Sequence, residues 1–190
     1  PVCVGKATRI TEYLQESDKT YRGEIYFGIS TDTQDSTGTI IQEGQDQPIA
    51  WGELENARQN MIGVIDQLPP MVSAIKQGGQ PLYKLARQGL NVARKTRRVQ
   101  IYSLDFLQSI DYITKGTRLL FDIHCSKGTY VRTICHDLGE AMGCPAHLSF
   151  LLRTRSGLFR LEQAVPLADL ALAPHQYLQP MDELLDLPSI

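Results

Sequence analysis

The segment 125–152, CSKGTYVRTICHDLGEAMGCPAHLSFLL, constrains the fold more than any other part of the chain. Apolar residues recur in it at helical spacing: Val131, Ile134, Cys135, Leu138 and Met142. Thr129 is a suitable N-cap residue, and Gly143 stands where such a helix would end. The segment therefore predicts a helix with one apolar face.

The residues that precede this predicted helix favour an anion. Gly128 permits a close approach of the backbone, and the free N–H groups of a helix start attract negative charge. Lys127 and Arg132 would add positive charge beside these groups. The pattern fits an anion site by geometry, although spacing alone favours the simpler interpretation, a capped core helix with two solvated cations.

Charge is unevenly distributed along the chain, whose formal net charge is -2. The span 67–104 contains no Asp or Glu. Its cations are Lys76, Lys84, Arg87, Arg94, Lys95, Arg97 and Arg98. No Lys or Arg follows Arg160, so the rest of the chain is acidic. A basic block of this kind indicates a polyanionic partner such as nucleic acid, or else a solvated basic face.

Composition and motifs exclude several classes of protein. No apolar run approaches the ~20 residues needed to span a bilayer, and the first residues do not form a signal peptide. The four cysteines form no CxxC pair, which favours a reducing compartment, and we expect a cytoplasmic protein. Neither a Gly-rich phosphate loop nor a GxSxG motif is present, so no cofactor is expected.

A metal site is the remaining alternative that the cysteines and histidines raise. The candidate zinc ligands are Cys125, His136, Cys144 and His147. A single Cys-x-x-His pair is only half of a zinc-binding pattern, and buried thiols beside a helix explain the cysteines better. We therefore expect no metal.

Hydrophobic periodicity predicts an alternation of strands and helices. Helices are expected over 6–17, 51–62, 81–89, 129–143, 166–172 and 181–185. Strands are expected over 21–29, 39–42, 71–75, 99–109, 117–125, 147–152 and 153–160. This order indicates the α+β class, with a mixed, largely antiparallel sheet flanked by helices. We expect one domain over 1–190, with the basic span 67–98 inserted at the rim of the sheet.

Several long motifs resemble the TruB family of tRNA pseudouridine synthases. They are PVCVGKATRITEYL, DKTYRGEIYFGISTDTQDSTG, QLPPMVSAIKQGGQPLYKLARQG, HCSKGTYVRT and DLGEAMGCPAHL, and together they cover most of the chain up to about Leu170. The resemblance implies the pseudouridine synthase fold and an isomerase that converts a T-loop uridine of tRNA to pseudouridine. It implies base flipping, an Asp nucleophile, and neither cofactor nor metal. The expected partner is tRNA, contacted at its T-loop and stem by a monomer.

The resemblance also implies roles for individual residues. Arg132 in KGTYVRT would pair with the nucleophilic Asp, and Tyr21 in DK-x-Y-R would pack on the flipped base, so both are expected to be catalytic. The expected substrate-binding residues are Tyr130, Leu151, Arg9, Tyr83, Lys84, Arg87 and Lys127. Val72 stands where the family usually has an aromatic residue, which removes one stacking contact with RNA.

The family's nucleophile is missing from these 190 residues. The family carries it in a G-T-L-D-P loop just before the segment that begins here with PVCVG, and no GTLDP occurs in the sequence. Asp32 and Asp35 belong to another motif and are expected to brace a loop. Arg132 is therefore expected to lack a carboxylate partner here, and the chain alone to be inactive until a preceding segment of the same protein supplies the Asp.

Two other functions fit the same residues. The basic span suits a non-catalytic RNA-binding or tRNA-folding module as well as it suits an enzyme. A metal-binding structural protein is the third alternative.

Overall fold

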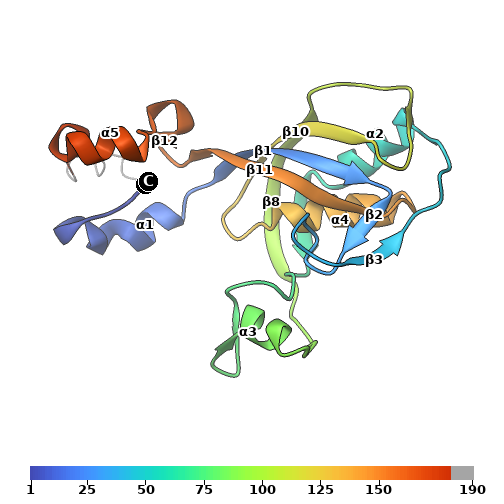
Figure 1. Ribbon diagram of the computed structural model, residues 1–190, viewed down its shortest axis with the longest axis horizontal. Helices are drawn as coiled ribbons and strands as arrows, with labels where there is room; N and C mark the ends of the chain where they lie inside the picture. The colour runs from blue at the N-terminus through green and yellow to red at the C-terminus, as the bar shows by residue number, and fades with distance from the viewer. Residues whose placement is uncertain (181–190) are drawn as a thin grey trace.

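The computed structural model describes residues 1–180, and its centre is a six-stranded sheet (Figure 1). The strand order is β12-β11-β1-β10-β8-β5, and every neighbouring pair in it is antiparallel. The strands are β1 (Lys19–Phe27), β5 (Gly63–Gln67), β8 (Arg97–Phe106), β10 (Arg118–Cys125), β11 (Ala146–Ser156) and β12 (Phe159–Arg160). The predicted α+β class with a largely antiparallel sheet is confirmed.

Helices and short strand pairs surround this sheet. The two longest helices are α2 (Trp51–Asn60) and α4 (Val131–Ala141). The shorter ones are η1 (Gly5–Ile10), α1 (Thr11–Gln15), α3 (Leu82–Arg87), η2 (Leu161–Gln163), α5 (Leu167–Leu172) and η3 (Pro174–Tyr177). Three small antiparallel pairs are β2 (Ile29–Thr31) with β3 (Ile40–Glu43), β4 (Ile49–Ala50) with β9 (Tyr112–Ile113), and β6 (Lys76–Gln77) with β7 (Gln80–Pro81). None of the helices described combines the length and apolar character that crossing a lipid bilayer would require.

The core lies between one face of the sheet and helices α2 and α4 (Figure 1). Alternation along β1 buries Gly23, Ile25 and Phe27 on this face, as the sequence predicts. Helix α4 contributes Ile134 and Leu138, which are almost completely buried. Burial of these apolar side chains removes them from water and is the main stabilising term of the fold.

The predicted start of α4 differs from the observed one. Tyr130 rather than Thr129 is the N-cap, and no side chain caps the helix. The Thr129 hydroxyl instead donates a hydrogen bond of 2.9 Å to the carbonyl of Ser126, within the preceding turn. The predicted end is confirmed, because Gly143 follows the helix with a φ of +65°, which glycine adopts readily.

Gly139 allows α4 to pack directly against the chain that leads into β11. A Cβ atom at this position would lie 2.6 Å from the carbonyl oxygen of Cys144 and 2.7 Å from the amide nitrogen of Ala146. We expect Gly139→Ala to lower the free energy of unfolding by about 1–3 kcal/mol, because backbone atoms must move apart. Urea unfolding measures this loss. The control Gly52→Ala, in α2, meets no atom within 4 Å and should leave stability unchanged or slightly raised; equal stability of both variants would contradict this packing.

Four predicted elements are wrong in detail. The two strands predicted over 147–152 and 153–160 are replaced by a single strand, β11, because β1 pairs with it from Lys19↔Ser156 to Phe27↔Ala146. The predicted strand 71–75 is irregular, and the short β6–β7 hairpin follows it instead. The helix predicted over 6–17 divides into η1 and α1. The helix predicted over 181–185 lies outside the described residues.

The basic segment 68–96 leaves the sheet from its edge strand, β5, and returns to the neighbouring strand, β8. It connects β5 to β8, which pair directly with each other through Gln67↔Arg97 at the point of departure. Its helix α3 projects away from the sheet (Figure 1). This segment is hereafter called the insertion.

Candidate active site

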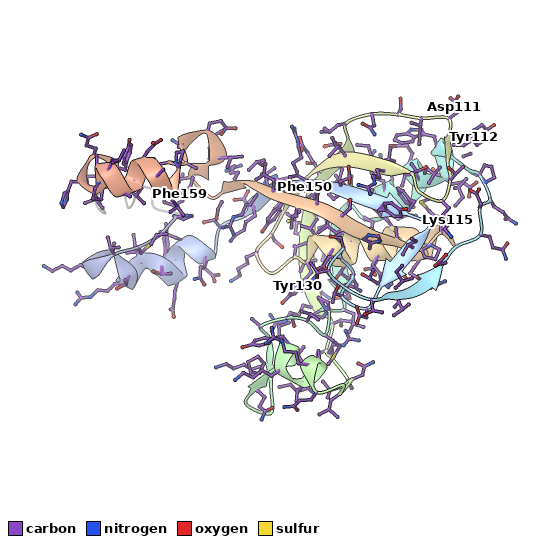
Figure 2. All side chains as sticks on the ribbon, in the orientation of Figure 1. Asp111, Tyr112, Lys115, Tyr130, Phe150 and Phe159 are labelled. Atoms are coloured by element: carbon purple, nitrogen blue, oxygen red, sulfur yellow. The ribbon has the colours of Figure 1, made fainter. Side chains whose placement is uncertain are left out.

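A cavity of about 410 Å³ opens beside the start of α4. Its wall combines residues from β1, β11, the start of α4 and the loop 32–37. Four of the predicted site residues lie in this wall: Tyr21, Tyr130, Arg132 and Leu151. The exposed ring of Phe150, labelled in Figure 2, lies in the wall as well. Residues more than 100 positions apart in the sequence therefore meet at one place.

Strand pairing explains why Tyr21 and Leu151 share the cavity. β1 and β11 are neighbours, with Tyr21 paired with Arg153 and Gly23 paired with Leu151. Tyr21 is half-buried, and burial raises the pKa of its phenol above the ordinary value. The ring is therefore neutral at pH 7, and its flat face is suited to stacking on another planar group.

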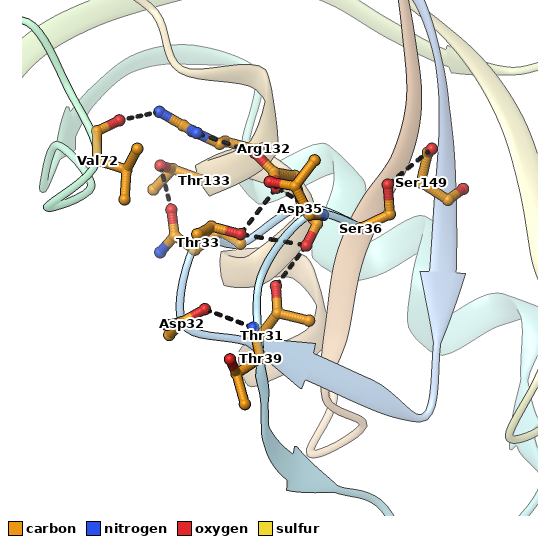
Figure 3. A network of polar contacts seen from close by, with 12 residues as sticks. Thr31, Asp32, Thr33, Asp35, Ser36, Thr39, Val72, Arg132, Thr133 and Ser149 are labelled. Carbon is orange, nitrogen blue, oxygen red and sulfur yellow. Dashed lines mark hydrogen bonds and ion pairs between the residues drawn. The ribbon is translucent and has the colours of Figure 1, made fainter. Parts of the chain in front are cut away.

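Arg132 occupies the first turn of α4 and is held from two sides (Figure 3). Its Nη1 donates a hydrogen bond of 2.9 Å to Oδ2 of Asp35, and its Nη2 donates to the carbonyl of Val72. Its guanidinium carbon lies 5.8 Å from the centre of the Tyr130 ring. The guanidinium therefore has a defined orientation at the cavity.

Asp35 is the centre of a hydrogen-bond network (Figure 3). Its Oδ1 accepts from the Thr33 hydroxyl at 2.7 Å, the Thr37 hydroxyl at 2.6 Å and the Thr37 amide at 3.0 Å. Burial alone would raise the pKa of Asp35, but these donors and Arg132 more than offset it, so this pKa lies below its ordinary value. Asp35 is consequently an anion at neutral pH.

The loop 32–37 is attached to β11 by its backbone. The Ser36 amide donates to the Leu148 carbonyl at 3.1 Å, and the Leu148 amide donates to the Gln34 carbonyl at 3.1 Å. Asp32 accepts from the Thr39 amide at 2.8 Å, which closes the base of the loop. The prediction that Asp32 and Asp35 brace a loop is confirmed.

The expectation that Arg132 lacks a carboxylate partner in this chain is wrong. Asp35 fills that role, with side chains of 19% and 22% relative exposure for Arg132 and Asp35. The pairing arises because a parallel bridge between Asp35 and Leu148 carries the loop across β11 to α4. The Ser and Thr residues around Asp35 are the one sign in the sequence that this carboxylate is held in place. They do not indicate that it pairs with Arg132, 97 residues away.

Five predicted substrate-binding residues lie outside this cavity. Lys127 is exposed and forms an ion pair with Glu16, so both cations of the predicted anion site have carboxylate partners. Arg9 is exposed in η1. The three others belong to α3 in the insertion: Tyr83, Lys84 and Arg87. Arg87 lies over the Tyr83 ring, with its guanidinium carbon 5.6 Å from the ring centre.

A second, basic cavity of about 310 Å³ lies between the insertion and the first residue of β8. Four cations line it: Lys76, Arg94, Lys95 and Arg97. Arg94 is fixed there, because its Nη1 donates to the Pro69 carbonyl at 2.9 Å. The sequence shows the excess of positive charge in this span, but it does not show that these four side chains converge.

The zinc ligands considered as an alternative do not form a site. Across residues 1–180, no group of three or more His, Cys, Asp or Glu side chains is arranged to hold a metal ion. All four cysteines are free, and burial raises the pKa of Cys125 to about 11, which keeps it a thiol. His147 shares a hydrogen bond of 2.8 Å with the Ile29 carbonyl through Nδ1.

The cavity suits a planar ring with polar edges. Aromatic and apolar side chains supply its flat surfaces, and the Arg132–Asp35 pair supplies a fixed polar group at one side. Such a combination orients a nucleobase by stacking and hydrogen bonding.

The chain matches two profiles of one protein family. The profile of the "TruB family pseudouridylate synthase (N terminal domain)" matches residues 1–131, and that of the "tRNA pseudouridylate synthase B C-terminal domain" matches residues 132–186. The chain is 48% identical over 192 residues to a tRNA pseudouridine synthase B of Symbiobacterium thermophilum. It is 46% identical over 171 residues to that of Syntrophotalea carbinolica.

The chain spans only part of these relatives. The first alignment covers 100% of this chain and 63% of the relative, and the second covers 90% and 54%. A crystal structure of a Cbf5-Nop10-Gar1 complex contains a chain with a similar fold, at a TM-score of 0.67 and 25% identity, over 95% of this chain and 46% of that one. The archaeal box H/ACA sRNP Nop10-Cbf5 complex, at a TM-score of 0.62 and 22% identity, supports the fold alone; the match covers 95% of this chain and 45% of that one.

Proposed function

The chain belongs to the TruB family of pseudouridylate synthases, and we propose that the complete protein isomerises a T-loop uridine of tRNA to pseudouridine. The observation that carries this proposal is the meeting of Tyr21, Tyr130, Arg132 and Leu151 in one cavity. Each comes from a motif that resembles the family's active-site motifs. A stacked uridine cannot reach such a cavity, so the target nucleotide is everted from the RNA.

The reaction proposed for this cavity is an isomerisation. A nucleophilic aspartate attacks, and the bond between N1 of uracil and C1′ of the ribose breaks. The ring turns while it remains between the Tyr21 ring and the Leu151 side chain. A bond forms between C5 and C1′ as the bond between C1′ and the attacking aspartate breaks, which restores the free carboxylate. C5 loses its proton and N1 gains one, so substrate and product have the same atoms. Confinement in the cavity keeps the detached ring beside its ribose.

We propose that the nucleophile belongs to a part of the protein outside these 190 residues, and that Asp35 is a support for Arg132. Both carboxylate oxygens of Asp35 are already engaged, since four donors from Thr33, Thr37 and Arg132 bind them. A carboxylate that is stabilised in this way, with a lowered pKa, is a weak nucleophile. Its hydrogen bond instead fixes the guanidinium before substrate arrives.

We further propose that the insertion binds the RNA backbone. Lys84 and Arg87 on α3 are exposed, and three cations of the 310 Å³ cavity, Lys76, Arg94 and Lys95, lie in the same segment. Guanidinium and ammonium groups are the usual partners of phosphate. Arg9 and Lys127 are proposed as further contacts outside the catalytic cavity. The stem of the T-arm is the region of tRNA that such a surface would hold.

Replacing Lys84 and Arg87 by alanine is expected to weaken tRNA binding and to reduce the slope of log K against log salt by about 2, roughly one for each lost phosphate contact. Filter binding over a series of KCl concentrations measures both. A control variant with Lys115 and Arg118 replaced by alanine loses the same charge outside the insertion, where these cations pair with Glu43 and Glu24. If both variants lowered the slope equally, the insertion would have no special role.

Release of tritium from C5-labelled uridine in a tRNA transcript tests the proposed function. The complete protein is expected to release tritium from one uridine per tRNA. Binding of tRNA without any release would favour the non-catalytic RNA-binding alternative, because the basic insertion is compatible with either function.

A further inference from the structure

Gln67 joins the insertion to the catalytic cavity. It is the last residue of β5, immediately before the insertion, and only 2% of it is exposed. Its side-chain amide meets the backbone of a single residue. The Tyr130 amide donates to Oε1 of Gln67 at 2.8 Å, and Nε2 of Gln67 donates to the Tyr130 carbonyl at 3.1 Å. These two bonds reproduce the pairing that a neighbouring strand would give.

Tyr130 needs this partner because of its place in the chain. It is the N-cap of α4, with extended φ and ψ of −96° and 102°. Its carbonyl already accepts from the Thr133 and Ile134 amides, at 3.1 and 3.2 Å. Its amide lies before the first turn of the helix, where no helical carbonyl can accept from it. Gln67 supplies that acceptor and so determines where the backbone of Tyr130 lies.

A second contact comes from the same end of the insertion. The Val72 carbonyl, five residues beyond Gln67, accepts from Nη2 of Arg132 (Figure 3). Tyr130 and Arg132 both line the catalytic cavity. Gln67, just before the insertion, and Val72, near its start, therefore hold two residues of the cavity wall, one through its backbone and one through its side chain.

We propose that Gln67 is a positioning residue for the isomerisation, which acts by fixing the backbone of Tyr130 at the cavity wall. This inference rests on the proposed function for its kinetic consequence, whereas the hydrogen-bond pair itself is independent of that function. A residue that only stabilised the fold would lower stability when replaced, without slowing the folded protein. A positioning residue changes the rate of the bound complex.

Two substitutions separate these roles in the complete protein. Gln67→Met keeps the length of the side chain and removes both hydrogen bonds. We expect the single-turnover rate to fall by about 10- to 100-fold, with little change in the Kd for tRNA, because the cavity wall is displaced by a fraction of an ångström. Ile65→Ala removes apolar contacts of the same strand but leaves the hydrogen bonds to Tyr130 intact. Under conditions in which this variant is folded, it should catalyse the reaction at the wild-type rate.

Gln67→Glu supplies a pH-dependent rescue. An ionised carboxylate can accept from the Tyr130 amide but cannot donate to its carbonyl. Burial raises the pKa of the introduced carboxyl, and its protonated form both donates and accepts, like the original amide. The rate of this variant relative to wild type should therefore rise as the pH falls. Gln59→Glu, on the exposed surface of α2, should show no such rise.

Hydrogen exchange of the Tyr130 amide is the readout that does not depend on activity. Relative to the exchange rate of an unstructured amide at the same pH, it should be slow in the wild type and faster in Gln67→Met. It should stay slow in Gln67→Glu, because the introduced carboxyl accepts from this amide whether or not it is protonated. A wild type that forms no pseudouridine would refute the proposed function but leave this exchange test intact. An active wild type whose Gln67→Met and Gln67→Glu variants turn over normally would overturn the positioning role. Exchange of the Tyr130 amide as slow in Gln67→Met as in the wild type would overturn the hydrogen-bond pair itself.

Discussion

Arg132→Ala in the complete protein is expected to slow uridine isomerisation by at least about 100- to 1,000-fold while leaving most of the tRNA affinity intact. The guanidinium is preorganised by Asp35 and by the Val72 carbonyl, so the cavity supplies a fixed positive charge to the reacting groups. Most of the proposed phosphate contacts lie elsewhere, in the insertion. Arg132→Lys should be almost as slow, because an ammonium group cannot satisfy two partners in the planar geometry of a guanidinium.

Single-turnover tritium release measures this loss, and filter binding measures the affinity. Arg22→Ala provides the matched control, since Arg22 is an exposed arginine of β1 that pairs with Asp122 at 2.8 Å. It should turn over normally. If Arg132→Ala retained the wild-type rate, its role beside the nucleophile would be refuted; if it lost tRNA binding instead, Arg132 would be a binding residue.

Asp35→Asn is expected to lower the free energy of unfolding by about 2–4 kcal/mol at pH 7, and to reduce turnover with it. The substitution leaves Arg132 without its carboxylate, and it replaces an anion that accepts from Thr33 and Thr37. This expected loss of unfolding free energy is small for a broken buried ion pair, because both side chains remain about one-fifth exposed to solvent. Urea unfolding measures the loss, and Asp32→Asn, at an exposed residue with a single bond to the Thr39 amide, is the control.

The same comparison has a defined dependence on pH. The pKa of Asp35 in the folded protein lies below its ordinary value, so its stabilising contribution is complete above the unfolded pKa of about 3.9. The contribution is lost as the pH falls through the folded pKa. The stability difference between the wild type and Asp35→Asn should therefore be largest near neutral pH and should shrink in acid. A difference that grows on acidification has the opposite sign and would refute this assignment.

The pattern of apolar residues predicted those helices and strands in which apolar residues recur at a regular spacing. The apolar face of α4 and the alternation of β1 follow from spacing alone, and both are observed. The continuous length of β11 follows from its partner instead, since β1 pairs with it on both sides of the expected break. Thr129 is not the N-cap because the helix begins one residue later, after Tyr130, and the Thr129 hydroxyl lies in the preceding turn, where it donates to the Ser126 carbonyl.

The candidate site was predictable only where a motif resembled a known family. Spacing alone would not have selected Tyr21, Tyr130, Arg132 or Leu151 from the other aromatic, basic and apolar residues of the chain. The supports of the cavity were missed because each acts across a long separation in sequence. Asp35 lies 97 residues from Arg132, Gln67 lies 63 from Tyr130, and Val72 lies 60 from Arg132. Nothing in the local pattern of a Gln or a Val indicates such a contact.

The most direct measurement is tritium release from C5-labelled uridine of an unmodified tRNA transcript, made in parallel with the complete wild-type protein and its Arg132→Ala variant. The cavity described here predicts release from one uridine per tRNA by the wild type, and binding with almost no release by the variant. Equal release by both proteins would place the chemistry outside this cavity, and no release by a wild type that binds tRNA would show that the protein is not an isomerase.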